Sequence, residues 1–304
     1  MSLRAEFLRL GLRWLVKSSG PIPDVAGSRK GYQAVKRFIP DPPKGTKVTR
    51  LAVGGVKAVR VATAQSLADR HVLYLHGGGY MNGSPSHYRD FLWRIADATS
   101  ATVLCIDYRL APEHPFPAAL DDAVAAYRWL LAEGAVPQRM AVMGDSAGGG
   151  LTFATLLRLR DEGVPMPAAA VALSPWTDLA LTGESIRTNA RAESMLNADQ
   201  ASAIASYYLD GADPRLPYVS PLFGDPAGLP PTLIQVGSDE VLHDDAVRMA
   251  ERLRAAGCSV EIEIWPRMPH AWQLFARVLP EARKAVARIG AFVQREMGST
   301  IQKL

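Results

Sequence analysis

Apolar residues along the chain change their spacing in a regular way, and that spacing predicts where strands and helices lie. Short apolar, β-rich runs bounded by glycine, proline or aspartate predict strands, whereas apolar residues three to four positions apart predict helices. The predicted strands cover residues 46–53, 56–62, 71–76, 102–107, 139–143, 168–173, 232–236 and 259–264. The predicted helices cover 2–17, 24–38, 87–99, 119–132, 151–159, 244–256 and 281–295, with helical pieces near 198–209.

The order of these elements predicts the fold class. Strands alternate with helices over most of the chain, which is typical of a parallel sheet covered on both faces, and Gly54-Gly55 predicts an antiparallel hairpin before it. We therefore expect an α/β fold with a mostly parallel, eight-stranded twisted sheet. Residues 45–176 and 221–304 are expected to form its catalytic domain. The helical segments 1–44 and 177–220 are expected to form a cap over the C-terminal edge of the sheet, where ligands bind in open α/β sheets.

Composition indicates the general class of protein but not the reaction that it catalyses. With 48% hydrophobic and 21% charged residues, the 304-residue chain has the composition of an ordinary globular enzyme. Two cysteines cannot form a disulfide framework, and they fit a reducing compartment. No apolar stretch has the length of a membrane-spanning helix, and arginines interrupt the apolar residues at the N-terminus, so we expect a cytoplasmic protein without stable membrane insertion.

Charge is unevenly distributed along the chain. Residues 1–50 contain eleven Lys/Arg and three Asp/Glu, a net +8, although the whole chain carries only +4. The favoured interpretation is a solvated face on surface helices; the alternative is attraction to anionic lipid or an acidic partner. Helix 2–17 is amphipathic, with Leu3, Phe7, Leu10, Trp14 and Leu15 on one stripe. Basic and aromatic residues are not interleaved as in nucleic-acid binders, so we expect no nucleic-acid partner.

A serine lies where one predicted strand meets a helix. The strand 139–143 leads into Gly144-Asp145-Ser146-Ala147-Gly148-Gly149, a Gly-x-Ser-x-Gly pattern followed at once by a helical run. A sharp strand-to-helix turn requires small neighbours, exposes the hydroxyl and directs the next backbone N–H toward negative charge. Upstream, His76-Gly77-Gly78-Gly79 follows another strand, and its glycines allow backbone N–H groups to approach a carbonyl oxygen. Together the two motifs predict a nucleophile with an oxyanion hole.

Two later loops supply a base and an acid. In chains with this serine turn the order is serine, acid, histidine, which leaves His243 and His270 as candidate bases. His270 lies in the loop directly after the last strand, which is the expected place for the base. The loop after strand 232–236 begins Gly237-Ser238-Asp239-Glu240. We choose Asp239 as the acid because it comes soonest after the strand, and Glu240 is the main alternative.

Taken together, the motifs resemble those of the hormone-sensitive-lipase-like branch of the α/β-hydrolase esterases, often called bacterial family IV. The resemblance rests on blocks in family order across nearly the whole catalytic body. These blocks are His76-Gly77-Gly78-Gly79-Tyr80, Asp107-Tyr108-Arg109-Leu110-Ala111-Pro112-Glu113, Gly144-Asp145-Ser146-Ala147-Gly148-Gly149, Ser174-Pro175-Trp176-Thr177-Asp178-Leu179, Gly237-Ser238-Asp239 and Met268-Pro269-His270. Glu240 departs from relatives that have a proline after the acid.

The resemblance implies a role for each matching residue. It implies a Ser146–His270–Asp239 triad and an oxyanion hole formed by the N–H groups of Gly78, Gly79 and Ala147. His76 and Asp145 would support the glycine loop and the serine turn, and Arg109 and Glu113 would brace that loop, although a surface ion pair explains the last two nearly as well. Candidates for the substrate pocket, which packing of the lid explains equally well, are Tyr80, Trp176, Met195, Leu196, Tyr207 and Tyr208.

The implied activity is hydrolysis of short- to medium-chain carboxylic esters through an acyl-enzyme, with no metal and no organic cofactor. A small-molecule ester is the expected partner, and a homodimer through the edge strand 259–264 is also implied. A lactonase, an amidase or a deacetylase would use the same triad. A small-molecule receptor on this fold loses the catalytic histidine, so His270 argues against it. A peripheral membrane lipase would require a large exposed apolar patch on helix 2–17.

Overall fold

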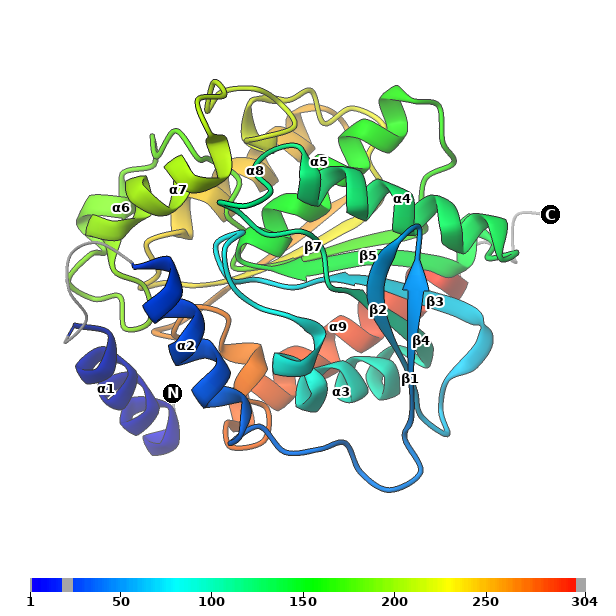
Figure 1. Cartoon of the computed structure of the whole chain (residues 1–304), viewed down its shortest axis with the longest axis horizontal. Coiled ribbons are helices and arrows are strands. Elements are labelled where there is room, and N and C mark those ends of the chain that lie inside the picture. The colour runs from blue at the N-terminus through cyan, green and yellow to red at the C-terminus, as the bar shows by residue number, and fades with distance from the viewer. Residues whose placement is uncertain (1, 18–23, 299–304) are drawn as a thin grey trace.

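The computed structural model describes residues 2–17 and 24–298 and places one mixed sheet at the centre of that part of the chain (Figure 1). Its eight strands lie in the order β1-β2-β4-β3-β5-β6-β7-β8. The strand β1 pairs antiparallel with β2, and β2 with β4, whereas the remaining pairs are parallel. The predicted fold is thereby confirmed. The strands are β1 Lys47–Val53, β2 Val56–Ala62, β3 Leu67–Leu75, β4 Ala101–Ile106, β5 Met140–Asp145, β6 Ala169–Leu173, β7 Thr232–Gly237 and β8 Val260–Trp265.

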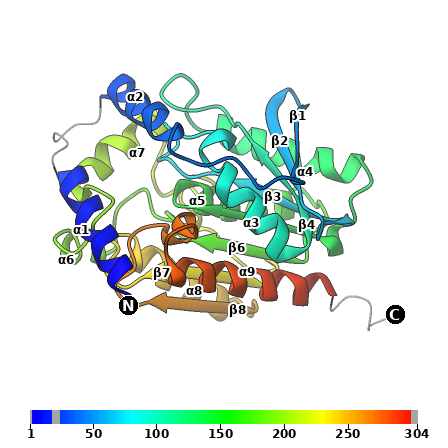
Figure 2. The same cartoon turned by 90° about the horizontal axis from the view of Figure 1, so that it is seen from below.

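Helices cover both faces of the sheet because alternate strand residues point to opposite sides. Leu73 and Val142 pack with α4, α5 and α8 in one buried cluster, whereas Val72 and Met143 pack with α3 and α9 in the other. Figure 2 shows α3 and α9 across this second face. The helices are α1 Leu3–Lys17, α2 Val25–Lys36, α3 Arg89–Thr99, α4 Ala118–Ala132, α5 Ala147–Asp161, α6 Ser185–Thr188, α7 Ala201–Leu209, α8 His243–Ala255 and α9 Pro280–Gly298.

The register of the parallel strands brings the ends of several strands to one edge. Gly144 of β5 pairs with Leu75 of β3, and Asp145 pairs with Leu173 of β6. At the far side of the sheet Gly237 of β7 pairs with Trp265 of β8. The residues that follow β3, β5, β6, β7 and β8 therefore emerge at the same carboxyl edge, which is where an open α/β sheet holds its ligands.

Helices that do not cover the sheet gather at one end of the molecule. The labels α1, α2, α6 and α7 all lie at the left of Figures 1 and 2, opposite the C-terminus. The helices α6 and α7 belong to the segment 174–231 that connects β6 to β7, here called the β6–β7 insertion. Within the described ranges, no helix is long and apolar enough to cross a bilayer.

Most element boundaries agree with the prediction to within a few residues, and two differences matter. The strand β7 extends through Gly237, one residue beyond the predicted end, so the loop that carries the acid begins at Ser238. The helix α5 begins at Ala147 rather than at residue 151, because Gly148, Gly149 and Gly150 are already helical. The serine therefore lies immediately before the first helical residue.

Candidate active site

Ser146 lies at a strained turn between β5 and α5. Its backbone has φ 56° and ψ −123°, a conformation that non-glycine residues seldom adopt. Hydrogen bonds hold the turn: the Ser146 N–H donates to the Leu173 carbonyl at 2.8 Å, and the Trp176 N–H donates to the Ser146 carbonyl at 2.9 Å. A side chain at Gly144 would collide with the Gly148 carbonyl, so the small residues of the motif are a steric requirement.

The glycine loop after β3 lies beside this turn. Gly78 and Gly79 have φ values of 122° and 62°, in the left-handed half of the map. In the described chain the N–H groups of Gly78 and Gly79 donate to no protein acceptor. The N–H of Ala147 belongs to the first turn of α5, where it has no partner within the helix. These donors are available to an oxyanion.

A buried polar network joins the glycine loop to the serine turn. The Asp145 carboxylate accepts hydrogen bonds from the Tyr74 hydroxyl at 2.7 Å, the Tyr88 hydroxyl at 2.9 Å and the Gly77 N–H at 3.0 Å. Burial raises the pKa of Asp145, and these hydrogen bonds oppose the shift. Asp145 is thus placed to hold Gly77 against the turn, in agreement with the support expected of it.

His76 has no exposed surface and stacks on Tyr108 with ring centroids 4.2 Å apart. Its Nδ1 lies 2.8 Å from the Gly77 carbonyl, and because a carbonyl only accepts, Nδ1 carries the proton. Burial lowers the pKa of His76 to about 4, against the opposing effect of the Gly77 hydrogen bond. The ring is therefore neutral at pH 7 and shapes the glycine loop.

His270 follows β8 and lies against Glu240. The His270 Nδ1 is 2.8 Å from Glu240 Oε2, and both side chains are buried. Burial alone would lower the pKa of His270, but the hydrogen bond and the charge of Glu240 outweigh it, so the pKa lies above the ordinary 6.5. Because the carboxylate accepts from Nδ1–H, Nε2 of the neutral ring is left as the proton acceptor.

The choice of Asp239 as the partner of His270 is corrected by this geometry. Asp239 is half-buried, and its Oδ1 accepts a hydrogen bond from the Ser238 hydroxyl at 2.8 Å; the structure gives it no hydrogen bond to His270 among the described residues. The reason is the turn that follows β7. A turn closes from the Gly237 carbonyl to the Glu240 N–H at 3.3 Å, so the fourth residue of the turn returns over the strand end.

Ser174 completes the support of the Glu240 carboxylate. Glu240 Oε1 accepts hydrogen bonds from the Ser174 hydroxyl at 2.7 Å and the Gly237 N–H at 2.6 Å. The Ser174 oxygen in turn accepts from the Ala271 N–H at 3.1 Å, next to His270. Sequence reasoning missed this role, although Ser174 follows β6 directly and belongs to one of the recognised blocks.

The β6–β7 insertion also contacts the loop that carries Glu240. Glu193 is buried; its Oε2 accepts from the Val241 N–H at 3.1 Å, and its Oε1 accepts from the N–H groups of Ser194 and Met195 at 2.7 Å each. The Asn189 amide donates to the Glu240 carbonyl at 2.9 Å. Burial raises the pKa of Glu193. No spacing or motif in the sequence indicates either residue.

The expected brace of Arg109 and Glu113 on the glycine loop is not what the structure shows. Arg109 pairs with Asp122 at 2.7 Å. Glu113 pairs at 2.7 Å with Arg29 of α2, and Arg29 Nε donates at 3.0 Å to the Met81 carbonyl, at the end of the glycine loop. The N-terminal segment therefore supplies the brace.

The pocket candidates separate into two groups. Tyr80 and Tyr208 stack with centroids 3.8 Å apart and, like nearby Trp176, are buried. The half-buried residues of the β6–β7 insertion are Met195, Leu196 and Tyr207. In addition, Ile204 of α7 lies directly against Gly79. The insertion thus covers the glycine loop.

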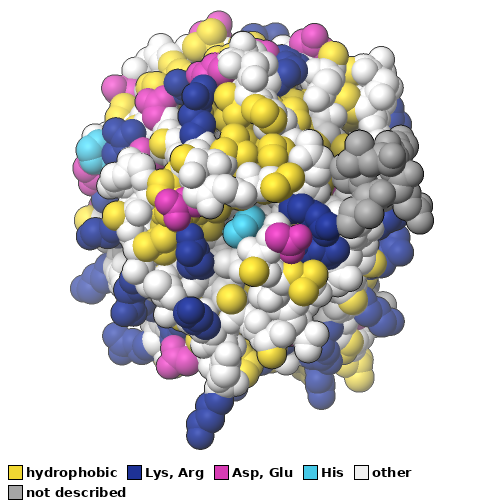
Figure 3. All heavy atoms as spheres, turned by 90° about the vertical axis from the view of Figure 1, so that its right-hand side faces the viewer, with side chains coloured by type: hydrophobic (Ala, Val, Ile, Leu, Met, Phe, Trp, Pro, Cys, Tyr) yellow, Lys and Arg dark blue, Asp and Glu magenta, His cyan; other side chains and the backbone are white. Residues whose placement is uncertain are grey.

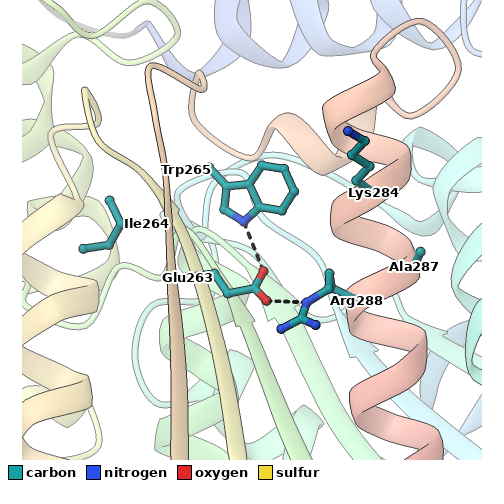
Figure 4. Close-up of a pocket in the computed structure, with 6 residues that line it drawn as sticks. All are labelled: Glu263, Ile264, Trp265, Lys284, Ala287 and Arg288. Atoms are coloured by element: carbon teal, nitrogen blue, oxygen red, sulfur yellow. Dashed lines mark hydrogen bonds and ion pairs between the residues drawn. The ribbon is translucent and has the colours of Figure 1, made fainter. Parts of the chain in front are cut away.

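A separate surface pocket of about 520 Å³ lies between β8 and α9 (Figure 4). In its wall Glu263 accepts hydrogen bonds from Trp265 at 3.1 Å and Arg288 at 2.7 Å. It shares no residue with the site around Ser146. In the described part of the chain, no cluster of His, Cys, Asp and Glu could hold a metal ion.

Comparisons with known proteins agree with this geometry. A model of the α/β-hydrolase fold family matches residues 72–274, more than half of the chain. An acetyl-hydrolase of Streptomyces hygroscopicus is 48% identical over 260 residues, covering 86% of each chain, and an esterase of Acinetobacter venetianus is 37% identical over 257 residues, covering 84% of each. The chain therefore belongs to the α/β-hydrolase fold family.

Solved structures narrow the class further. A crystal structure of an esterase from the bacterial hormone-sensitive lipase family superposes with a TM-score of 0.93 at 45% identity, covering 98% of this chain and 99% of that one. EstE5, soaked with p-nitrophenyl butyrate, superposes with a TM-score of 0.93 at 41% identity, covering 98% and 100%. The predicted branch, that of hormone-sensitive-lipase-like esterases, and the predicted enzyme class, a serine ester hydrolase, are confirmed.

Proposed function

We propose that this protein hydrolyses short- to medium-chain carboxylic esters with a Ser146–His270–Glu240 triad. The observation that carries the proposal is the buried 2.8 Å pair of His270 Nδ1 and Glu240, which follows β7 and β8 at the same sheet edge as the strained Ser146 turn. Nucleophile, base and orienting acid are the three parts that acyl transfer requires.

In the first half-reaction the Ser146 hydroxyl attacks the acyl carbon while His270 Nε2 accepts its proton. Glu240 holds the tautomer and stabilises the imidazolium. The N–H groups of Gly78, Gly79 and Ala147 bind the oxyanion of the tetrahedral intermediate; one such donor is typically worth on the order of 10²–10³ in turnover. The imidazolium then protonates the leaving alcohol, and water repeats the attack on the acyl-enzyme.

The substrate pocket is proposed to lie beneath a cap formed by residues 1–44 and 177–220. The contact of Ile204 with Gly79 and the ion pair of Arg29 with Glu113 support this, because both cap segments contact the region of the glycine loop. Two relatives support small acyl groups: one is named an acetyl-hydrolase, and crystals of the other, EstE5, were soaked with p-nitrophenyl butyrate. The half-buried Met195, Leu196 and Tyr207 are the proposed acyl contacts.

The test is a chain-length series of p-nitrophenyl esters, run beside simple lactones and anilides with wild type and Ser146→Ala. We expect turnover of acetyl to hexanoyl esters, falling with longer chains, and none by the variant. Faster hydrolysis of lactones or amides would identify a lactonase or an amidase. Turnover retained by the variant would remove Ser146 from the mechanism.

We also propose a homodimer through β8. Within residues 2–17 and 24–298 this strand pairs only with β7 and so ends the sheet with an open edge, and Ile264 on it is 47% exposed. Light scattering of wild type and Ile264→Lys is the test. A monomeric wild type would exclude the dimer, and a dimer unaffected by the variant would place its interface elsewhere.

A further inference from the structure

The outer face of α1 carries an exposed apolar stripe. Four large side chains, at spacings of four, three and four residues, lie on one side of this helix. Their exposed fractions are 80% for Leu3, 75% for Phe7, 50% for Leu10 and 75% for Trp14. The side chain of Leu15, predicted for the same stripe, lies outside the described residues. The four residues are called the α1 stripe below.

The stripe is not the surface by which α1 joins the fold. The opposite face of the helix is buried, with Ala5 1% exposed and Leu8 packed against the core cluster of α3 and α9. Polar contacts hold the helix as well: the Ser2 hydroxyl donates to Glu281 at 2.9 Å, and Arg267 pairs with Glu6 at 3.3 Å. The exposed face of α1 therefore has no role in its attachment.

Two basic residues flank the stripe. Arg4 is exposed and Arg13 half-buried, and at 100° per residue they lie on either side of it. They belong to α1, whose sequence holds four Lys/Arg against one Asp/Glu. The opposite end of the molecule, which faces the viewer in Figure 3, carries hydrophobic, basic and acidic side chains interspersed with one another.

This combination identifies the partner by its chemistry. An apolar stripe with Trp and Phe, flanked by arginines, is the pattern of helices that lie in the interface of a bilayer. A second copy of the chain is disfavoured, because pairing through the stripe would bring two strongly basic segments together. A spanning helix is excluded, because α1 has 15 residues and about 20 are needed.

We propose that α1 binds the surface of a membrane rich in anionic lipids. The α1 stripe enters the boundary between headgroups and acyl chains, and the basic N-terminal segment neutralises lipid phosphates. Since α1 contacts Arg267, three residues before His270, the membrane lies on the side of the active site. This inference concerns binding and does not depend on ester hydrolysis.

The test is co-sedimentation of the full chain with vesicles of phosphatidylcholine or of equimolar phosphatidylcholine and phosphatidylglycerol. We expect wild type to bind the anionic vesicles at low salt and to dissociate as salt rises. Phe7→Ser/Trp14→Ser should lower the partition constant by roughly tenfold or more, because two large apolar groups no longer leave water. Circular-dichroism melting of both proteins checks that the variant is folded.

The matched control is Leu67→Ser/Val136→Ser. These positions are 48% and 49% exposed, and both lie at the opposite edge of the sheet, before β3 enters the core and before β5. The control should bind as wild type does. A second measurement tests the contact of Trp14 with lipid without a polar substitution. Brominated lipid should quench the tryptophan fluorescence of wild type more strongly than that of Trp14→Phe.

Four results would overturn the proposal. The first is a wild type that does not bind anionic vesicles at low salt. The second is equal binding by wild type and Phe7→Ser/Trp14→Ser, and the third is equal binding of wild type to neutral and anionic vesicles. The fourth is a wild-type dimer that the same variant dissociates, with no vesicle binding, which would assign the stripe to a second copy.

Discussion

Replacement of Glu240 by glutamine changes one atom of the proposed acid and reverses its hydrogen bonding. Glu240 Oε1 accepts from the Gly237 N–H and from the Ser174 hydroxyl, whose own oxygen already accepts from Ala271. The amide oxygen of glutamine must occupy this position because both neighbours donate. The NH₂ group then faces His270 Nδ1, 2.8 Å away in the wild type, and can only donate to it.

The expected loss follows from the tautomer of His270. When Nδ1 accepts a hydrogen bond, the proton of the neutral ring lies on Nε2, which can no longer take the proton of Ser146. The corresponding substitution in a Ser-His-Asp protease lowers kcat by about 10⁴, a value from another protein. We expect Glu240→Gln to lower kcat by on the order of 10³–10⁴, or about 4–5 kcal/mol of transition-state stabilisation.

The assay is steady-state hydrolysis of p-nitrophenyl acetate, with circular-dichroism melting to show that the fold is intact. Asp239→Asn is the matched control, since Asp239 contacts Ser238 and the structure gives it no hydrogen bond to His270 among the described residues. We expect less than a tenfold change from it. A folded Glu240→Gln enzyme within tenfold of wild type, or a severe loss confined to Asp239→Asn, would refute the assignment of the acid.

Other predictions concern groups around the triad. Ser174→Ala leaves the Ala271 N–H without its acceptor and should lower the free energy of unfolding by about 1–3 kcal/mol in denaturant titrations, with a fall in kcat at nearly constant KM. The acid limb of kcat/KM should have its midpoint above pH 6.5, because the pKa of His270 is raised and only the neutral ring is a base. Glu193→Gln removes a negative charge that raises this pKa, so the limb should move to lower pH; an unchanged limb would contradict that. Burial and a neighbouring carboxylate raise the pKa of Asp245 to about 8. The folded state therefore keeps a proton that the unfolded chain releases, and stability should fall between about pH 4 and 8 in wild type but not in Asp245→Asn. Urea titrations at pH 4 and pH 8 measure the free energy of unfolding of both proteins. An equal change with pH in wild type and Asp245→Asn would refute the assignment to Asp245.

Local patterns predicted much of the fold and part of the site. The spacing of apolar residues, together with the glycines that bound the apolar runs, predicted the strands of the sheet and their order along the chain. Ser146 was singled out because it directly follows a strand, and His270 because it lies in the loop after the last strand. Asp239 was chosen because it comes soonest after β7, but the turn from Gly237 to Glu240 brings the second carboxylate, not the first, to His270. Which of two adjacent carboxylates meets a histidine 30 positions away depends on tertiary packing that no local pattern encodes.

The contacts made by the β6–β7 insertion could not be predicted either, because they also join residues that are far apart in the sequence. Glu193 lies in a region without regular periodicity, and its significance comes from a partner 48 positions away, Val241. The sequence also did not reveal which side of α1 faces the core, because this helix is apolar on two faces. Spacing alone identified an apolar stripe but could not say which face of the helix would be covered.

The attachment of the β6–β7 insertion to the Glu240 loop limits how new substrate ranges can arise. Asn189 and Glu193 hold the backbone of that loop, so the first half of the insertion cannot be exchanged without disturbing the acid. The half that begins after Leu196 includes α7, whose Ile204 lies against Gly79 of the glycine loop. We therefore expect that replacing the insertion from Leu196 onward with the matching segment of a relative changes the acyl preference and keeps activity. Replacement that starts before Ser185 should abolish activity.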